Sequence, residues 1–281
     1  MQTITTCKAC HKQFTGKYCN YCGEKRYTDH DRTIKHFVEE GIHFVTHFEG
    51  TFFTTVKYLF TRPGKLSADY CYGIRKTLFK PLSLFLLLCI IYLLFPVFEG
   101  LNMRLYYHTN GSIYSGFAKH EVMKVMQQHN WTNEQMAEAF HHQSTKVSKF
   151  LLLVLLPLTA LFFWLLTYKK RRYFFDQMVF ATEINSVYLI WGFMILPLLL
   201  SLFEFIYGAF AHHAFPFTDT GIGLVMYALL LVYVVLASRR FYGIKTGYAI
   251  FVALLFLVAH HVIVQFIYKF ILFITSIKLV K

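Results

Sequence analysis

The stretch PLSLFLLLCIIYLLFPVF, residues 81–98, decides the class of this fold. It contains no charged residue, and about 20 apolar residues are needed to cross the hydrocarbon core of a bilayer as a helix. The 281-residue chain has a mean hydropathy of +0.44 and 15% charged residues, whereas soluble domains carry about 25%. The sequence therefore predicts a polytopic membrane protein.

Four more apolar runs follow at intervals that leave room for connecting loops. They cover residues 150–168, about 184–210, about 222–237 and about 248–274. We expect an all-α membrane protein with about five transmembrane helices in residues 81–281. The segment 99–149 is too long for a hairpin, and its WTNEQMAEAF has Thr132 and Gln135 spaced as a helix capping box. It predicts a small helical insert on the outer side.

The basic residues indicate how the chain is oriented. Lys and Arg cluster before the first run, in KKRR at 169–172 and around Arg239 and Arg240, whereas residues 211–221 contain neither. Positive residues favour the cytoplasmic side, which places the N-terminus inside and, with five spans, the C-terminus outside. Lys269, Lys278 and Lys281 run against this trend, so the location of the C-terminus stays open. The first 33 residues lack the apolar core of a signal peptide. Topology explains the net charge of +13, so no nucleic-acid partner is expected.

Residues 1–30 predict a cytoplasmic head of the zinc-ribbon type. The spacing C-x2-C-x8-C-x2-C is that of a four-thiolate zinc site, formed by Cys7, Cys10, Cys19 and Cys22. Gly23 follows the second pair, where such a turn needs a positive φ. Four protein ligands leave no open coordination position, so the zinc is expected to be structural.

Residues 31–80 predict an amphipathic interfacial helix followed by a basic linker. Apolar residues of 33–60 recur at helical spacing on one face, with too many charges for a span. The TRPG at 61–64 ends this helix, because proline does not continue a helix and glycine favours a turn. The linker's Arg62, Arg75 and Lys76 are candidate contacts for anionic lipid headgroups, although anchoring at the membrane surface explains them too.

A second candidate metal site lies within the predicted interfacial helix. Its members follow one another at steps of four, three and four residues, which puts them on one helical face: His36, Glu40, His43 and His47. Glu40 and His43 form the Glu-x-x-His pair of di-metal helical sites. Polar positions on a membrane-surface helix explain the same pattern.

Polar residues inside the later spans form a candidate intramembrane site. They are Asp176, Glu183, Asn185, Glu204 and His260. Ionisable groups within a membrane are costly and warrant a functional hypothesis. The alternatives are a pairing of Asp176 with Arg171 or Arg172, an outer-interface position for Glu204, and an interhelical hydrogen bond for His260.

The order of these features resembles an uncharacterised family of bacterial inner-membrane proteins, a domain of unknown function with an N-terminal Cys-x-x-Cys head. The resemblance rests on YCNYCGEK (18–25), LFTRPGKLSADYCYGIRKTLFKPLSLFLLL (59–88) and RRYFFDQMVFATEINSVYLI (171–190). In the family the third stretch is richer in histidine, whereas this chain has Gln177, Glu183 and Asn185. The resemblance implies a bacterial inner-membrane location and transfers no activity.

No phosphate loop, nucleophile elbow, dinucleotide fingerprint or zincin motif is visible. We therefore expect a non-enzymatic scaffold or accessory subunit that meets a protein partner through its zinc head, and an oligomer stays open. One alternative is a transporter or channel that uses Glu183, Glu204 and His260. The other is a membrane enzyme that acts on lipid or quinone, with the His36–His47 face as its metal site.

Overall fold

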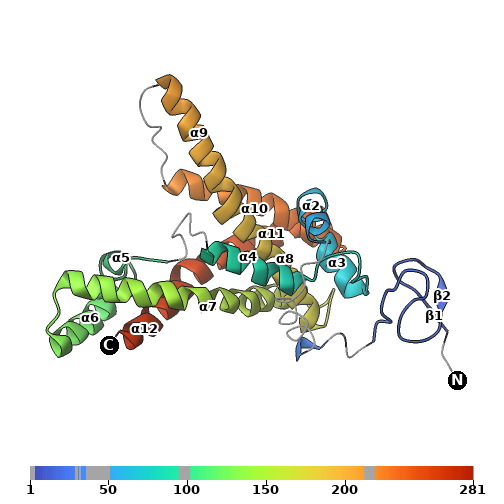
Figure 1. Ribbon diagram of the computed structural model, residues 1–281, viewed down its shortest axis with the longest axis horizontal. Helices are drawn as coiled ribbons and strands as arrows, with labels where there is room; N and C mark the ends of the chain where they lie inside the picture. The colour runs from blue at the N-terminus through green and yellow to red at the C-terminus, as the bar shows by residue number, and fades with distance from the viewer. Residues whose placement is uncertain are drawn as a thin grey trace.

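The computed structural model describes residues 4–28, 31, 33–35, 51–94, 102–211 and 219–280. A two-stranded ribbon, β1 (Thr5–Thr6) paired antiparallel with β2 (Gln13–Phe14), lies at the N-terminal end, and the rest of the ordered elements are helices (Figure 1). The helices are α2 (Phe52–Thr61), α3 (Lys65–Tyr72), α4 (Pro81–Leu94), α5 (Leu105–Asn110), α6 (Ser115–His129), α7 (Asn133–Thr167), α8 (Phe174–Leu189), η3 (Ile190–Ile195), α9 (Leu196–Ala211), α10 (Asp219–Tyr242), α11 (Thr246–Val262), η4 (Ile263–Tyr268) and α12 (Lys269–Leu279).

Four helical stretches are long and apolar enough to cross a membrane. They are Phe150–Thr167, Phe174–Tyr207, Gly221–Tyr242 and Thr246–Leu279, and they match the last four predicted runs. The first predicted run forms α4, whose apolar helix is shorter, and residues 95–101 beyond it lie outside the described part of the chain. Five spans therefore stay a prediction, of which four are helices of sufficient length.

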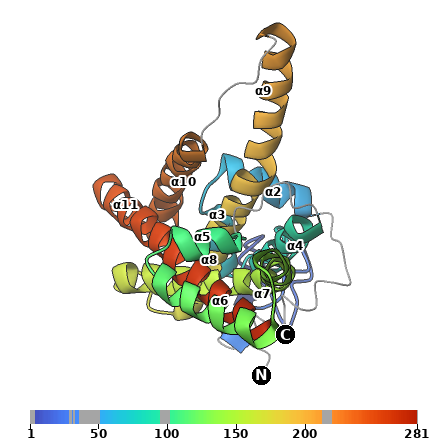
Figure 2. The ribbon, with the colours of Figure 1, turned by 90° about the vertical axis from the view of Figure 1, so that its left-hand side faces the viewer.

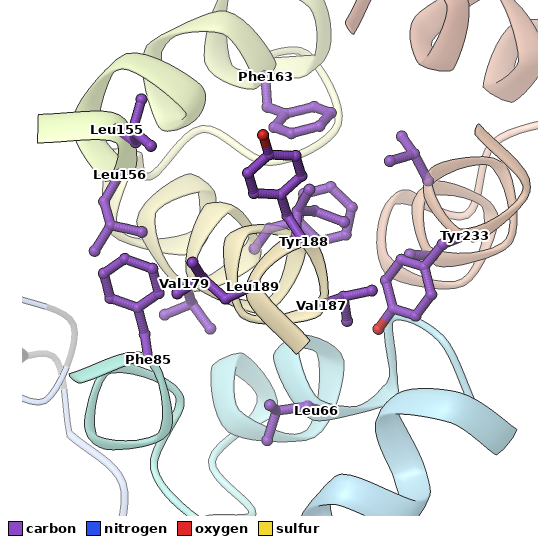
Figure 3. Close-up of a cluster of buried hydrophobic side chains, with 14 of the residues drawn as sticks. Leu66, Phe85, Leu155, Leu156, Phe163, Val179, Val187, Tyr188, Leu189 and Tyr233 are labelled. Carbon is purple, nitrogen blue, oxygen red and sulfur yellow. The ribbon is translucent and has the colours of Figure 1, made fainter. Parts of the chain in front are cut away.

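Helix α8 lies at the centre of the bundle. Almost every one of its side chains is buried, and α3, α4, α7 and α10 pack around it. Figure 3 shows Val179, Val187 and Leu189 of α8 surrounded by side chains from these neighbours, with Leu66 on one side and Phe163 on the other. An apolar helix surrounded on all sides is a core helix, so the polar residues of α8 face protein groups.

Two of the long stretches contain a π-helical segment, and one of them also contains a proline close to that segment. In the stretch Phe174–Tyr207, η3 ends at Ile195 and Pro197 is the second residue of α9; proline removes a backbone hydrogen bond and favours a kink. Helix α9 then leaves the body of the protein in both views (Figures 1 and 2). Its large apolar side chains are exposed, including Leu198, Phe203 and Phe205. In Thr246–Leu279, η4 joins α11 to α12.

The described part of the insert at 99–149 is helical, as predicted, but it is continuous with the second apolar stretch. Helix α7 begins at Asn133 with the predicted capping box, in which Thr132 Oγ1 accepts from Gln135 N and Gln135 Oε1 accepts from Thr132 N. It runs unbroken to Thr167, so the expected boundary at residue 149 falls inside a helix. The C-terminal end of α12 packs against α6 and α7 through Phe273 and Ile277. The C-terminus and the insert thus share one end of the molecule, and the cysteine head lies at the other (Figure 1).

The predicted break at 61–64 is confirmed. Helix α2 ends at Thr61, and Gly64 adopts a left-handed φ of 77° before α3 begins at Lys65. The residues after this break are not only the predicted linker, because Lys65–Tyr72 form α3. The reason is tertiary, because α3 is held by groups far away in the sequence.

Candidate metal centre and its anchoring site

The N-terminal head contains two similar turns that bring the four cysteines together. The amide of His11 donates to Cys7 O at 2.9 Å, and the amide of Gly23 donates to Cys19 O at 2.8 Å. Both residues have positive φ, 60° at His11 and 70° at Gly23. The sequence prediction for Gly23 is confirmed. His11 was missed because a histidine gives no signal for this conformation, although its place after a Cys-x-x-Cys pair is equivalent.

The four sulfur atoms fit a tetrahedral metal site. All lie within 4.8 Å of one another, and the Sγ atoms are 3.5 Å apart for Cys7 and Cys22 and 3.6 Å apart for Cys10 and Cys19. A zinc ion with Zn–S bonds of about 2.3 Å requires sulfur separations of about 3.8 Å. The cysteines come from both turns, so a bound metal closes the head into one unit.

Glu24 joins this head to the helical body. Its Oε1 accepts from the amide of Arg75 at 3.2 Å, and its Oε2 accepts from the amide of Lys76 at 3.1 Å. In return, Lys76 Nζ donates to Cys22 O at 2.6 Å. The Glu24 carboxylate is buried, so these bonds satisfy a charge that would otherwise be costly to bury. The head is therefore attached to the connection between α3 and α4.

Arg75 strengthens the same contact through its side chain. Its guanidinium lies 4.3 Å from the ring centre of Tyr70 and 4.6 Å from that of Tyr27, and Nη2 donates to Asp31 O at 2.8 Å. Cations over aromatic faces are attracted by the ring quadrupole. Gly73 permits the close approach of Tyr27, because a Cβ there would lie 2.9 Å from the ring.

Asp31 fastens the end of the head segment. Lys25 Nζ donates to its Oδ1 at 2.8 Å, and the amide and hydroxyl of Thr28 both donate to its Oδ2 at 2.8 Å. Burial opposes ionisation of this carboxyl, but the bonds from Lys25 and Thr28 outweigh it and lower the pKa of Asp31 to about 2. The carboxylate is ionised at neutral pH and holds the chain leaving the head.

A second buried carboxylate, Glu183 of α8, anchors the start of α3. Its Oε1 accepts from the amide of Gly64 at 2.7 Å and from the Tyr233 hydroxyl at 2.8 Å. Its Oε2 accepts from Ser67, through the amide at 2.8 Å and the hydroxyl at 2.5 Å. These amides belong to the first turn of α3, where a helix has unpaired N–H groups and a positive dipole end. Glu183 caps a helix from another part of the chain.

The turn before α3 is fitted closely to α10. Arg240 Nη1 donates to Pro63 O at 2.6 Å. A Cβ on Gly64 would lie 2.5 Å from the backbone oxygen of Ala237 and would need a left-handed φ. Two independent reasons therefore require glycine at this position: the left-handed backbone conformation and the lack of space for a Cβ.

The other end of α3 meets the start of α8. Asp176 pairs with Arg171 at 3.3 Å, as one of the sequence alternatives proposed, and the buried thiol of Cys71 lies near its charge. Burial, followed by the nearby Asp176 charge, raises the pKa of Cys71 well above its usual value. Ser67 binds Glu183, and Cys71 lies near Asp176, so the α3 and α8 helices run antiparallel to each other. Cys71 is a protonated core thiol.

The remaining intramembrane residues do not share a site with Glu183. Asn185 Nδ2 donates to Ala181 O of its own helix at 2.8 Å, and Glu204 is exposed on α9. His260 is buried beside Tyr188, with 4.6 Å between ring centres. Among the described residues neither of its ring nitrogens has a hydrogen-bond partner.

Two further sets of predicted residues are placed differently. Residues 36–50, and with them His36, Glu40, His43 and His47, lie outside the described part of the chain, so the second metal site stays a prediction. Of the candidate headgroup contacts, Arg75 and Lys76 bind the head, whereas Arg62 stacks 5.3 Å from the ring centre of Tyr58. A lipid role for these three also stays a prediction.

The arrangement defines a class before any relative is considered: a helical protein with apolar helices of membrane-spanning length and a four-cysteine head. Residues 49–93 match a protein family described as "Protein of unknown function (DUF3667)". No curated protein and no solved structure matches the chain. The matched segment contains the residues whose amides donate hydrogen bonds to the two buried glutamates. Gly64 and Ser67 donate to Glu183, and Arg75 and Lys76 donate to Glu24. The family match thus covers the connection between the head and the bundle.

Proposed function

We propose that this protein is an integral inner-membrane scaffold or accessory subunit whose cytoplasmic head holds a structural zinc ion. Cys7, Cys10, Cys19 and Cys22 are the ligands, because four thiolates at this spacing and separation suit zinc. The ion supplies the head's folding free energy, since the buried apolar core of the head is very small.

The observation that carries this proposal is the pair of hydrogen bonds from Arg75 N and Lys76 N to Glu24. A head on a free tether would sample many positions. Here Glu24, Arg75 and Lys76 fix it against the α3–α4 connection, and Glu183 in turn fixes α3 against the central helix. The head's outer face therefore keeps one position relative to the membrane helices, as a scaffold requires.

That outer face has the composition of a contact surface for a protein partner. Tyr18 and Tyr21 are more than half exposed, and Lys17 and Lys12 lie over their respective rings. Exposed tyrosines provide large contact area at low entropic cost. The lysines favour a partner with acidic groups.

The end of the helical bundle that faces the cytoplasm is inferred from where its basic residues lie. Lys169–Arg172 and Arg240 line one cavity next to α8, and Arg240 also holds Pro63 of the α2–α3 turn. The loop at 168–173 and the C-terminal end of α10 therefore share the end of the bundle that carries the head's attachment. The positive-inside rule makes this the cytoplasmic end.

A photo-crosslinking amino acid at Tyr21 in intact cells tests the scaffold role. We expect one protein adduct of defined mass at Tyr21, loss of that adduct in Cys22→Ser, and no such adduct from the exposed control position Tyr173. Equal labelling at Tyr21 and Tyr173, or an adduct that persists in Cys22→Ser, would contradict the proposal.

A second candidate function is transport, and His260 is the observation that favours it. A buried imidazole without hydrogen-bond partners among the described residues is costly, and its partner ring Tyr188 directly precedes the Leu189–Ile190 junction where η3 begins. π-Helical segments occur frequently at functional sites. Ion flux into proteoliposomes that is unchanged in His260→Ala and Glu183→Gln would rule this role out.

A further inference from the structure

A cavity of about 610 Å³ opens at the end of the molecule that carries the insert. It lies between the start of α5 and the helix that runs from α11 through η4 into α12. Its basic lining residues are Arg104, His261 and Lys269. This volume is in the usual range for small-molecule sites, which lies between about 300 and 1,000 Å³.

The cationic character of this cavity is not explained by membrane topology. Positive residues are expected on the cytoplasmic side, yet this cavity is at the end shared by the insert and the C-terminus. No Asp or Glu is among the described residues that line it. Within that part of the chain, neither Arg104 nor Lys269 lies within 4 Å of a carboxylate. The cations therefore lack a protein counter-charge there.

The side chains converge because of their spacing and their local supports. His261, Gln265 and Lys269 follow one another at steps of four residues, which keeps them on one side of the helix. Gln265 Oε1 accepts from Lys269 Nζ at 2.5 Å and so fixes the half-buried ammonium. An ammonium has three donors, and this bond uses one of them. The opposite wall is fixed by Asn102, which donates to Thr145 Oγ1 at 3.2 Å.

The rest of the wall suggests a ligand larger than a simple ion. Tyr107, Phe266 and Met103 contribute apolar surface, while Ser112 and Asn102 add neutral polar groups. Lys269 follows Thr246 by 23 residues, which is about 35 Å of helix, beyond a hydrocarbon core of about 30 Å. In the orientation proposed above, with Thr246 at the cytoplasmic edge of the membrane, this depth is level with the phosphates of the lipid headgroups on the other side.

We propose that this cavity binds a phosphate ester that carries an organic group, with Arg104 and Lys269 as the residues that hold the phosphate. Arginine offers a planar pair of donors to two phosphate oxygens, and lysine adds a point charge. The organic group lies against Tyr107 and Phe266. The headgroup of an anionic phospholipid and a soluble phosphate ester share this chemistry.

The test uses the full-length protein in nanodiscs of phosphatidylcholine with increasing phosphatidylglycerol, and native mass spectrometry to count retained lipids. We expect one retained phosphatidylglycerol per chain, and an apparent affinity at least about tenfold weaker in Lys269→Gln and in Arg104→Gln, because each removes a charge-assisted bond. Lys278→Gln is the matched control, since Lys278 is exposed on α12 and does not line the cavity. It should change the affinity less than twofold.

A competition arm identifies the source of the phosphate. Glycerol 3-phosphate that displaces the lipid from the wild type at millimolar concentration assigns the site to soluble esters, and failure to displace it assigns the site to lipid. Arg104 is exposed, so Arg104→Gln tests the cavity even where Lys269→Gln alters folding. Lipid retention that is equal in wild type, Arg104→Gln and Lys278→Gln overturns the proposal. A wild type that retains no phosphatidylglycerol and binds no glycerol 3-phosphate overturns it as well.

Discussion

Replacing Glu183 with glutamine tests whether this carboxylate anchors α3. The carboxyl group accepts four hydrogen bonds, two at each oxygen. Glutamine has a single carbonyl oxygen, so whichever way the amide is turned, two of the four donors face an NH2 group. One of these two donors is a hydroxyl, which can turn and accept from the NH2, so one backbone amide loses its acceptor. A buried donor left without an acceptor costs about 1–3 kcal/mol, and the substitution should weaken the attachment of α3 by about that amount.

Hydrogen exchange of the purified protein measures this loss where it occurs. Each 1.4 kcal/mol corresponds to about a tenfold change in an equilibrium constant, so peptides covering residues 62–70 should exchange about 5- to 140-fold faster in Glu183→Gln. Peptides from α12 should change little, because that helix does not contact Glu183. Ser67→Ala, which removes only the hydroxyl donor, should have a smaller effect on residues 62–70.

Glu204→Gln is the matched control, since Glu204 lies on the same long helical stretch but is exposed on α9. It should leave exchange in residues 62–70 unchanged. Exchange in these residues that is equally slow in Glu183→Gln and wild type would refute the anchoring role. A 62–70 exchange rate that rises equally in Glu183→Gln and Glu204→Gln would point instead to a general effect on the bundle.

Four further outcomes are expected. Cys22→Ser should reduce bound zinc, measured by elemental analysis, from one ion per chain to well below one, because a tetrahedral site with three thiolates is incomplete; full occupancy would exclude Cys22 as a ligand. Glu24→Gln should speed amide exchange in the turn between α3 and α4, since it removes a charged acceptor from two amides; unchanged exchange would mean that the head is held by other contacts. Gly64→Ala should lower the thermal midpoint of unfolding more than Gly243→Ala does. A left-handed φ costs an alanine about 1–2 kcal/mol at either position, but only the Cβ at Gly64 meets a backbone atom. Equal midpoints for the two variants would refute the packing argument. Asp31 has a pKa depressed to about 2 in the fold, so its contribution to head stability is present above about pH 4 and is lost as pH falls toward 2; Asp31→Asn should flatten this acid dependence of head unfolding, and an unchanged acid limb would contradict it.

The features that the sequence alone determined are local in the chain. The four-cysteine spacing, the positive φ at Gly23, the Thr132 capping box and the helix end before Pro63 all depend on residues within a few positions of one another. The apolar spans are equally local, because length and hydropathy alone define them. These features predicted a membrane protein with a metal head, and four of the five expected helices have spanning length.

Only the tertiary structure decided how the pieces are joined. Glu24 meets Arg75 across 51 residues and Glu183 meets Gly64 across 119, and neither glutamate has a local pattern that names its partner. In the sequence, Glu183 is an ionisable residue in an apolar run, which predicts a functional site within the membrane. In the fold its four hydrogen bonds make it the cap of α3. The physical reason is that a buried charge is tolerated only where donors converge on it, and packing of distant helices sets that convergence.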